Sequence, residues 1–537
     1  MVKCFLRILS LISCCLMLFA LVSCGKTEGK SDTGSKDSDN LSELDKVARE
    51  IADSYAGFDL PKINDGKPVT IKVHLGDIIP TLSEIPTAEQ PDVFNSTEIL
   101  RRAFMMLFPN VTVEWARTVD TSSSDAFLQY ITTQLNSGTA PDIVSAWGAS
   151  FAYRGWYYDF TEVLEKPNPF VKDNKRWRDQ FPEYVFATWQ VSDAKDRVVA
   201  IPVSLAAGTS TALYYNKELF SKLSINAPKT WEDLFTACKT LLGNGYISFS
   251  PWGGPGSGNR KISTTLWDVQ FSLGPYYAAK QKDKLDYNGD GIQSQSELFR
   301  AAYEGHYFVS TNDYVWDMWK QVKRKYTTCL EKGYENSDYE TKWLLGKVGI
   351  LEDGLWRYPS ELSNTDRQFE FGIIPPPAID TDSTEFVDKL EYTESGPYRP
   401  VPRASFNIIK DSAMAHGGEG NIQACVAFLQ FLTQPDNNNM IINEEKGKSI
   451  SIIKGSKVPP QLTEYFKQPF PKTPSFSWPG GFTNAGAEKM SKILELWVKD
   501  QISDSEFKKQ FDDEFKKDIM EFVQLMQIDT SQYKKGF

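Results

Sequence analysis

The chain has 537 residues, too many for one compact core, so two large lobes or three smaller units are expected. Apolar residues make up 41% and charged residues 24%, which excludes a disordered or fibrous chain. Lys+Arg number 59 and Asp+Glu 70, a net charge of −11. This acidic balance argues against a nucleic-acid-binding protein, because phosphate binding needs a basic surface.

The first 24 residues have the pattern of an export signal. Lys3 and Arg7 form a short basic region, and the apolar stretch 8–22 that follows is short for a membrane-spanning helix. The segment ends in Leu-Val-Ser-Cys24, which resembles the lipobox of bacterial lipoproteins. The resemblance implies that residues 1–23 are a signal peptide and that Cys24 carries a lipid. The alternative is an ordinary signal peptide that is cut nearby.

Residues 24–44 are predicted to be a flexible tether, since Gly25 to Asn40 contain no large apolar residue. An acidic domain anchored through such a tether works outside the cytoplasm. Cys238, Cys329 and Cys425 also remain after signal removal, an odd and widely spaced set in which no disulfide framework can be read. Cys238 and Cys425 lie in apolar helical patterns and are predicted to be buried.

Strands and helices alternate in the first part of the mature chain. Residues 69–75 and 111–115 alternate apolar and polar side chains and predict strands. Helices are predicted near 95–108 and 125–135, and Pro141-Asp142 leads into a short buried strand. This order implies an α/β fold with a largely parallel sheet.

Two segments carry a resemblance to a known family. Residues 136–166 (NSGTAPDIVSAWGASFAYRGWYYDFTEVLEK) and 201–241 (IPVSLAAGTSTALYYNKELFSKLSINAPKTWEDLFTACKTL) resemble the extracellular solute-binding proteins, family 1, of bacterial ABC importers. The second segment carries the Tyr215-Asn216 pattern and a Thr-Trp-Glu-Asp-Leu helix start near Thr230. Leu205 departs from the pattern, which usually has a small residue or Pro there. Later landmarks keep the family order, so the resemblance covers about residues 68–525.

The resemblance implies two α/β lobes in a type II periplasmic-binding-protein-like fold, with a hinge between them. The first lobe is predicted to hold residues 45–200 and 404–446, and the second 201–403 and 447–537.

The sharpest local motif lies within residues 286–297 and satisfies the EF-hand pattern D-x-[DN]-x-[DN]-G-x5-E. Its predicted Ca²⁺ ligands are Asp286, Asn288, Asp290, the carbonyl of Ile292, Ser294 and Glu297. One departure is Gln293, where EF-hands carry an apolar residue. A structural Ca²⁺ site is predicted, and the alternative is a polar loop.

Aromatic residues in loops are the candidate sugar-binding side chains, because a flat ring suits the C–H face of a pyranose. Asp77, at the end of the first predicted strand, and Arg403, near the second predicted crossing between the lobes, are candidates for binding hydroxyl groups. The predicted ligand-binding residues are Asp77, Trp147, Trp252, Trp267, Tyr276, Trp356, Arg403 and Trp478. For each tryptophan the alternative is packing in the core.

Enzyme motifs are missing from the sequence. No G-x-S-x-G, HExxH or Walker A stretch occurs, and the neighbouring Glu352 and Asp353 are predicted to point to opposite faces of a strand. His416 is predicted to lie in a loop with no serine or cysteine partner.

These patterns predict a lipid-anchored, extracytoplasmic solute-binding protein. It would capture a carbohydrate, most simply an oligosaccharide, and deliver it to the permease of an ABC importer. The alternatives are a peptide or another solute as ligand, a glycan-acting hydrolase, and a calcium-stabilised interaction protein without transport.

Overall fold

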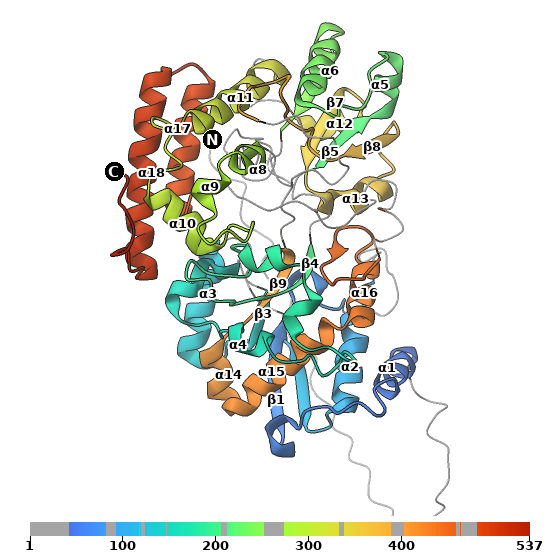
Figure 1. Ribbon diagram of the computed structural model, residues 1–537. Coiled ribbons are helices and arrows are strands. Elements are labelled where there is room, and N and C mark those ends of the chain that lie inside the picture. The colour runs from blue at the N-terminus through green and yellow to red at the C-terminus, as the bar shows by residue number, and fades with distance from the viewer. Residues whose placement is uncertain are drawn as a thin grey trace, which may run out of the picture. The chain divides into compact units, whose positions relative to one another are not determined.

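The computed structural model describes residues 42–81, 93–117, 119, 124–145, 148–205, 212–251, 273–331, 338–387, 402–457, 462 and 481–537, and in these residues the strands form two sheets (Figure 1). The first sheet has the strand order β10-β4-β9-β3-β1-β2. Its strands are β1 Val69–His74, β2 Val111–Trp115, β3 Ile143–Ser145, β4 Ile201–Leu205, β9 Pro402–Ile408 and β10 Ile450–Ser451. We call this sheet and its helices the first lobe.

The first sheet is parallel at one end only. β1 pairs in parallel with β2 and β3, whereas β9 and β4 and then β10 join in antiparallel order. The βαβ pattern read from the sequence therefore holds for β1 to β3, and the later strands differ because they come from distant parts of the chain. β4 and β10 belong to this sheet, although their residues were assigned to the second lobe in the sequence analysis.

Helices and short 3₁₀ turns complete the first lobe. They are α1 Glu43–Asp53, η1 Ile63–Gly66, η2 Gly76–Ile78, α2 Ser96–Leu107, α3 Ser124–Ser137, η3 Gly148–Arg154, α4 Thr161–Leu164, η4 Trp177–Gln180, η5 Glu183–Ala187, α14 Lys410–Gly417, α15 Glu419–Leu432 and α16 Pro435–Glu444. α15 is buried on nearly all sides because its sequence is apolar around the whole helix.

The second sheet has the order β6-β7-β5-β8. Its strands are β5 Ala212–Asn216, β6 Ile247–Ser250, β7 Val348–Asp353 and β8 Phe371–Ile374. The surrounding helices are α5 Lys217–Lys222, α6 Trp231–Gly243, α8 Gly274–Ala279, α9 Lys282–Leu285, α10 Gln295–Tyr303, α11 Asp313–Cys329, α12 Tyr339–Leu344, η9 Leu355–Arg357, α13 Tyr358–Ser363, α17 Asn484–Val498 and α18 Asp504–Met526. We call this group the second lobe.

Local sequence signals account for several boundaries. β1, β2 and the helices α2 and α3 lie where the periodicity predicts them, within two residues. The predicted cap of α6 is confirmed, since Thr230 and Asp233 form a reciprocal capping box. Ser503 and Glu506 cap α18 in the same way. Such caps satisfy backbone N–H groups that a helix start leaves without partners.

The two lobes also touch through the end of α18. Met526 belongs to a small apolar cluster with Phe127 of α3, Phe151 of η3 and Tyr157. The predicted mixed α/β architecture with two lobes is thereby confirmed, and the loops at the ends of its strands carry the candidate site.

Candidate functional site

The loop after β1 lies at the carboxyl edge of the parallel strands, where open α/β sheets bind ligands. Asp77, in η2, is exposed there. Gly76 has a φ of +59°, and a Cβ at this position would lie 2.9 Å from Oγ of Ser145 at the end of β3. A glycine is needed because other residues rarely adopt this positive φ and because Ser145 leaves no room for a side chain.

His74 closes β1 directly before this loop and is 5% exposed. Burial lowers the pKa of His74 to about 4, and the nearby Asp77 carboxylate opposes that shift. The imidazole is therefore neutral near pH 7, and it contributes no positive charge to the edge of the sheet.

The loop after β7 carries the partly exposed Trp356. Its indole lies so close to Gly354 that a Cβ on this glycine would come within 2.1 Å of the ring. The Tyr214 hydroxyl donates to the Gly354 carbonyl at 3.0 Å. The glycine and the tyrosine together fix the backbone on which the indole lies.

Arg357, next to this tryptophan, connects three carboxylates. It donates to Glu340 at 2.7 and 3.0 Å, to Glu361 at 2.6 Å and to Asp353 at 3.3 Å. Burial opposes the charge of the guanidinium, but the hydrogen bonds and the three negative charges outweigh it and raise the pKa of Arg357. The network holds the ends of β7, α12 and α13 together beside Trp356.

The structure places the remaining predicted ligand-binding residues unevenly. Tyr276, in α8, is 2% exposed and packs in the core, so its ring presents no free face. Arg403 lies in β9, and its side chain is outside the described part of the chain. Trp147, Trp252, Trp267 and Trp478 also lie outside the described residues. Asp77 and Trp356 are thus the two predicted ligand contacts whose exposed or partly exposed side chains the structure describes.

The loop 286–297 is closed by its own hydrogen bonds. The Asp286 carboxylate accepts from the amides of Gly289 and Gly291 at 2.7 and 2.9 Å. The Glu297 carboxylate accepts from the amides of Tyr287, Asn288 and Ser294 at 2.8 to 3.0 Å. In the described residues no set of three or more His, Cys, Asp or Glu side chains is gathered as metal ligands.

The unusual Gln293 of this loop has a structural explanation. Its side chain is fully buried, and its amide donates to the Tyr307 hydroxyl at 2.8 Å and to the Leu285 carbonyl at 3.4 Å. In an EF-hand an apolar residue at this position would pack against a second hand. Here the Gln293 amide instead binds the hydroxyl of Tyr307 and the carbonyl of Leu285.

The same loop region contacts the first lobe through Asp196, a residue with a φ of +56°. The Asp196 carboxylate accepts from the Ser296 amide at 3.0 Å and from the hydroxyl groups of Ser294 and Ser296. Gln295 donates to the Ala187 carbonyl at 2.6 Å. These hydrogen bonds therefore hold the start of α10 against the segment that precedes β4.

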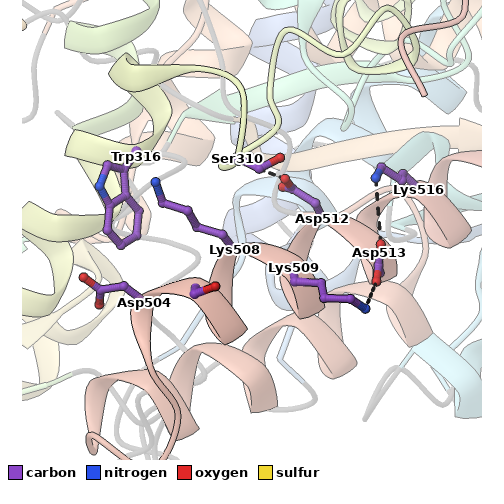
Figure 2. Close-up of a pocket in the computed structure, with 9 residues that line it drawn as sticks. Ser310, Trp316, Asp504, Lys508, Lys509, Asp512, Asp513 and Lys516 are labelled. Carbon is purple, nitrogen blue, oxygen red and sulfur yellow. Dashed lines mark hydrogen bonds and ion pairs between the residues drawn. The ribbon is translucent and has the colours of Figure 1, made fainter.

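A surface groove of about 600 Å³ lies between α11 and α18 (Figure 2). Lys508 Nζ lies 4.2 Å from the centre of the Trp316 ring and covers it. Lys509 and Lys516 both pair with Asp513, at 2.9 and 3.8 Å. Lys509, Lys516 and Asp513 are thus paired with each other, and Lys508 covers a face of the Trp316 ring. The groove therefore offers a sugar no free aromatic face at Trp316.

His416 lies in the last turn of α14 and not in a loop, so that prediction was wrong. Its Nδ1 is 2.7 Å from Asp142 Oδ1 and 3.4 Å from Ser412 Oγ, so it also has a serine partner. A catalytic triad needs the serine and the carboxylate on opposite ring nitrogens. Here both meet the same nitrogen, and the cluster joins α14 to the start of β3.

Glu352 and Asp353 have different partners, as expected for neighbouring residues of a strand. Glu352 pairs with the buried Lys325 at 2.7 Å, and Asp353 pairs with Arg357 at 3.3 Å. Neither pair leaves a carboxylate free to act as a general acid or base.

Sequence reasoning missed the two connecting residues Arg357 and Asp196. The four-residue spacing of Arg357 and Glu361 could have revealed the first, because residues four apart at a helix start lie on one face, whereas Asp353 is still part of β7. Nothing in the sequence near Asp196 indicates its distant serine partners.

The comparisons with known proteins agree with this architecture. The model of a family described as bacterial extracellular solute-binding protein matches residues 104–467. A Brucella abortus (strain 2308) protein named as a binding protein is 28% identical over 205 residues, 37% of this chain and 42% of the relative. The matched part thus spans less than half of that relative.

Solved structures show the same fold at low sequence identity. A cyclic alpha-maltosyl-1,6-maltose binding protein from Arthrobacter globiformis matches with a TM-score of 0.55 and 14% identity, covering 86% of this chain and all of that one. A family 1 extracellular solute-binding protein from Bifidobacterium longum subsp. infantis matches with a TM-score of 0.52 and 16% identity, covering 84% and 100%. A chitin oligosaccharide binding protein matches with a TM-score of 0.55 and 15% identity, covering 84% and 99%.

Proposed function

The chain belongs to the bacterial extracellular solute-binding proteins, and from this premise we propose that it captures a carbohydrate for an ABC importer. Binding without catalysis is the proposed role. One observation carries the choice of ligand: Trp356 lies partly exposed at the end of β7, on a backbone held by Gly354, Tyr214 and the Arg357 network. A held indole loses little conformational freedom when a sugar ring stacks on it.

Similarity to proteins named for maltosyl-maltose and chitin oligosaccharide supports a sugar over a peptide. The proposed contacts are Trp356 from the second lobe and Asp77 from the first, with Trp147, Trp252, Trp267, Arg403 and Trp478 as further predicted contacts. Tyr276 is left out because its ring is buried. An oligosaccharide that touches both lobes would favour their closure, since it binds the closed state more tightly.

The test is calorimetric titration with a panel of mono- and oligosaccharides. Trp356→Ala is expected to weaken the binding of the best ligand by about 1–3 kcal/mol, roughly 5- to 150-fold. Trp316→Ala is the matched control, because that ring is also partly exposed but is covered by Lys508 in the groove on α18. Equal losses in both variants, or glycan cleavage by the wild type, would contradict the proposal.

The anchor is proposed from the lipobox, with Cys24 as the lipid-bearing residue and the outer face of the cell membrane as the location. In the described part of the chain, no helix combines the length and apolar character needed to span a bilayer. Metabolic labelling with a fatty acid should mark the wild type. Label that persists in Cys24→Ala would refute this assignment.

We also propose that residues 286–297 bind Ca²⁺ as a structural ion, with ligands from Asp286, Asn288, Asp290, Ile292, Ser294 and Glu297. The motif and the turn that gathers Asp286 and Glu297 around the loop amides support it. Ca²⁺ should raise the melting temperature by mass action, and Asp286→Asn should remove that response while the exposed Asp283→Asn keeps it. A melting temperature that changes neither with Ca²⁺ nor with chelator would contradict the proposal and favour a polar loop that binds no ion.

A further inference from the structure

Two cysteines meet in the core of the second lobe. Cys238 lies on α6 and Cys329 is the last residue of α11, and both are fully buried. The two helices pack against each other, and the two thiols are in hydrogen-bonding contact. Ninety residues separate them in the chain, which is why their spacing revealed no pair.

The surroundings hold both helices in place. The Ser248 hydroxyl of β6 donates to the Cys329 carbonyl, and Lys325, one turn earlier on α11, forms the buried pair with Glu352 of β7. On the other side Gly349 of β7 leaves space for Leu241 of α6, since a Cβ there would lie 2.4 Å from its side chain. The thiols are therefore brought together by a packed and charged core and not by a mobile loop.

We propose that Cys238 and Cys329 form a disulfide when the chain folds outside the cytoplasm. The proposal rests on the export that the proposed function includes, since disulfides persist in oxidising compartments. The thiolate of one cysteine attacks the disulfide of an exchange oxidant, such as an oxidised dithiol oxidoreductase, and the second thiolate then attacks the mixed disulfide. The two cysteines lose two protons and two electrons, and the oxidant leaves as a dithiol.

Burial determines when this exchange can take place. Burial raises the pKa of the Cys329 thiol well above its ordinary value, and only the thiolate reacts. The bond therefore forms during folding, before the core closes, and in the folded protein it resists reductants. It closes a chain segment that contains the loop 286–297.

The experiment uses the full chain exported by a host and alkylated in denaturant without reductant. Peptide mapping should find the peptides of Cys238 and Cys329 linked to each other. Cys425, which is buried on α15 of the first lobe, should be alkylated and serves as the internal control. Alkylation of all three cysteines in the exported chain would overturn the proposal.

A variant gives an independent readout. In Cys238→Ala, Cys329 should become alkylated, and reductant should no longer change the unfolding midpoint in urea, whereas it lowers that of the wild type. Cys425→Ala should keep the wild-type response to reductant. An equal response in Cys238→Ala and in the wild type would count against the bond. Sugar binding is measured on the same samples, so a failure of the proposed function is seen separately.

Discussion

The loops after β1 and after β7 each follow a strand that pairs in parallel with a neighbour, but they are held in different ways. The loop after β7 is fixed by charged side chains, with Arg357 bound to three carboxylates. The loop after β1 is fixed by backbone conformation, through the positive φ of Gly76 and its contact with β3. One loop therefore depends on electrostatics and the other on the absence of a side chain, and different changes should disrupt them.

The largest effect is expected from Arg357→Ala. Removing the guanidinium takes a shared cation away from the buried carboxylates of Asp353 and Glu361, although Glu361 keeps Arg367 at 3.3 Å. The loss costs about 3 kcal/mol in the free energy of unfolding. Urea denaturation measures this loss. Arg176→Ala is the control, because Arg176 makes exposed ion pairs with Glu165 and Asp179 that should contribute little. Similar losses in both variants would show that the network does not fix the β7 loop.

Lowering the pH should act on the β1 side. The pKa of His74 is about 4 in the folded chain and about 6.5 when unfolded, so the unfolded state binds the proton more tightly. Above pH 6.5 neither state is protonated and His74 does not reduce the free energy of unfolding. As the pH falls from 6.5 to 4 the unfolded state gains the proton first and the free energy of unfolding decreases, until the loss is complete below pH 4. The loss amounts to at most about 3 kcal/mol.

His74→Gln should flatten the dependence of unfolding free energy on pH between 6.5 and 4. His306→Gln is the control, since burial also lowers the pKa of His306 but its side chain is more exposed. Parallel curves for the wild type and His74→Gln would argue that this histidine is hydrated in solution.

Two glycine variants separate backbone strain from crowding. Gly57→Ala has a positive φ but nothing within 4 Å of the added Cβ, so it should cost about 1 kcal/mol. Gly76→Ala adds the contact with Ser145 and should cost about 2 kcal/mol or more. Thermal unfolding of both variants measures the difference. Equal costs would mean that Ser145 rotates away freely.

The smallest effect is expected from Asp77→Asn. The side chain is exposed, so the free energy of unfolding should change by less than about 0.5 kcal/mol. Sugar affinity should fall by about 1 kcal/mol if the carboxylate accepts a hydroxyl hydrogen bond. Calorimetry on Asp77→Asn and on Asp65→Asn compares a predicted contact with an exposed acid at the opposite end of β1. Unchanged affinity in both would remove Asp77 from the site.

The sequence predicted individual helices and strands better than the contacts between distant parts of the chain. Periodicity and caps located β1, β2, α2, α3 and α6, because these depend on neighbouring residues. The order of the family's motifs along the sequence predicted the two lobes. The antiparallel places of β4, β9 and β10 could not be read, since sheet order is decided by residues hundreds of positions apart. For the same reason the sequence did not indicate the partners of Arg357, Asp196 and His416, and Tyr276, a predicted ligand contact, is buried on α8.

The position of β9 has a consequence for how the chain is made. β9 begins at Pro402 and lies between β3 and β4, so the interior of the first sheet is completed by a late part of the chain. Until residue 408 has been synthesised, β3 has one edge without its neighbour and β4 has both edges unpaired, because β10 follows later still. The first lobe therefore finishes folding only after most of the second lobe has been synthesised, and a chain interrupted before β9 exposes these strand edges to aggregation.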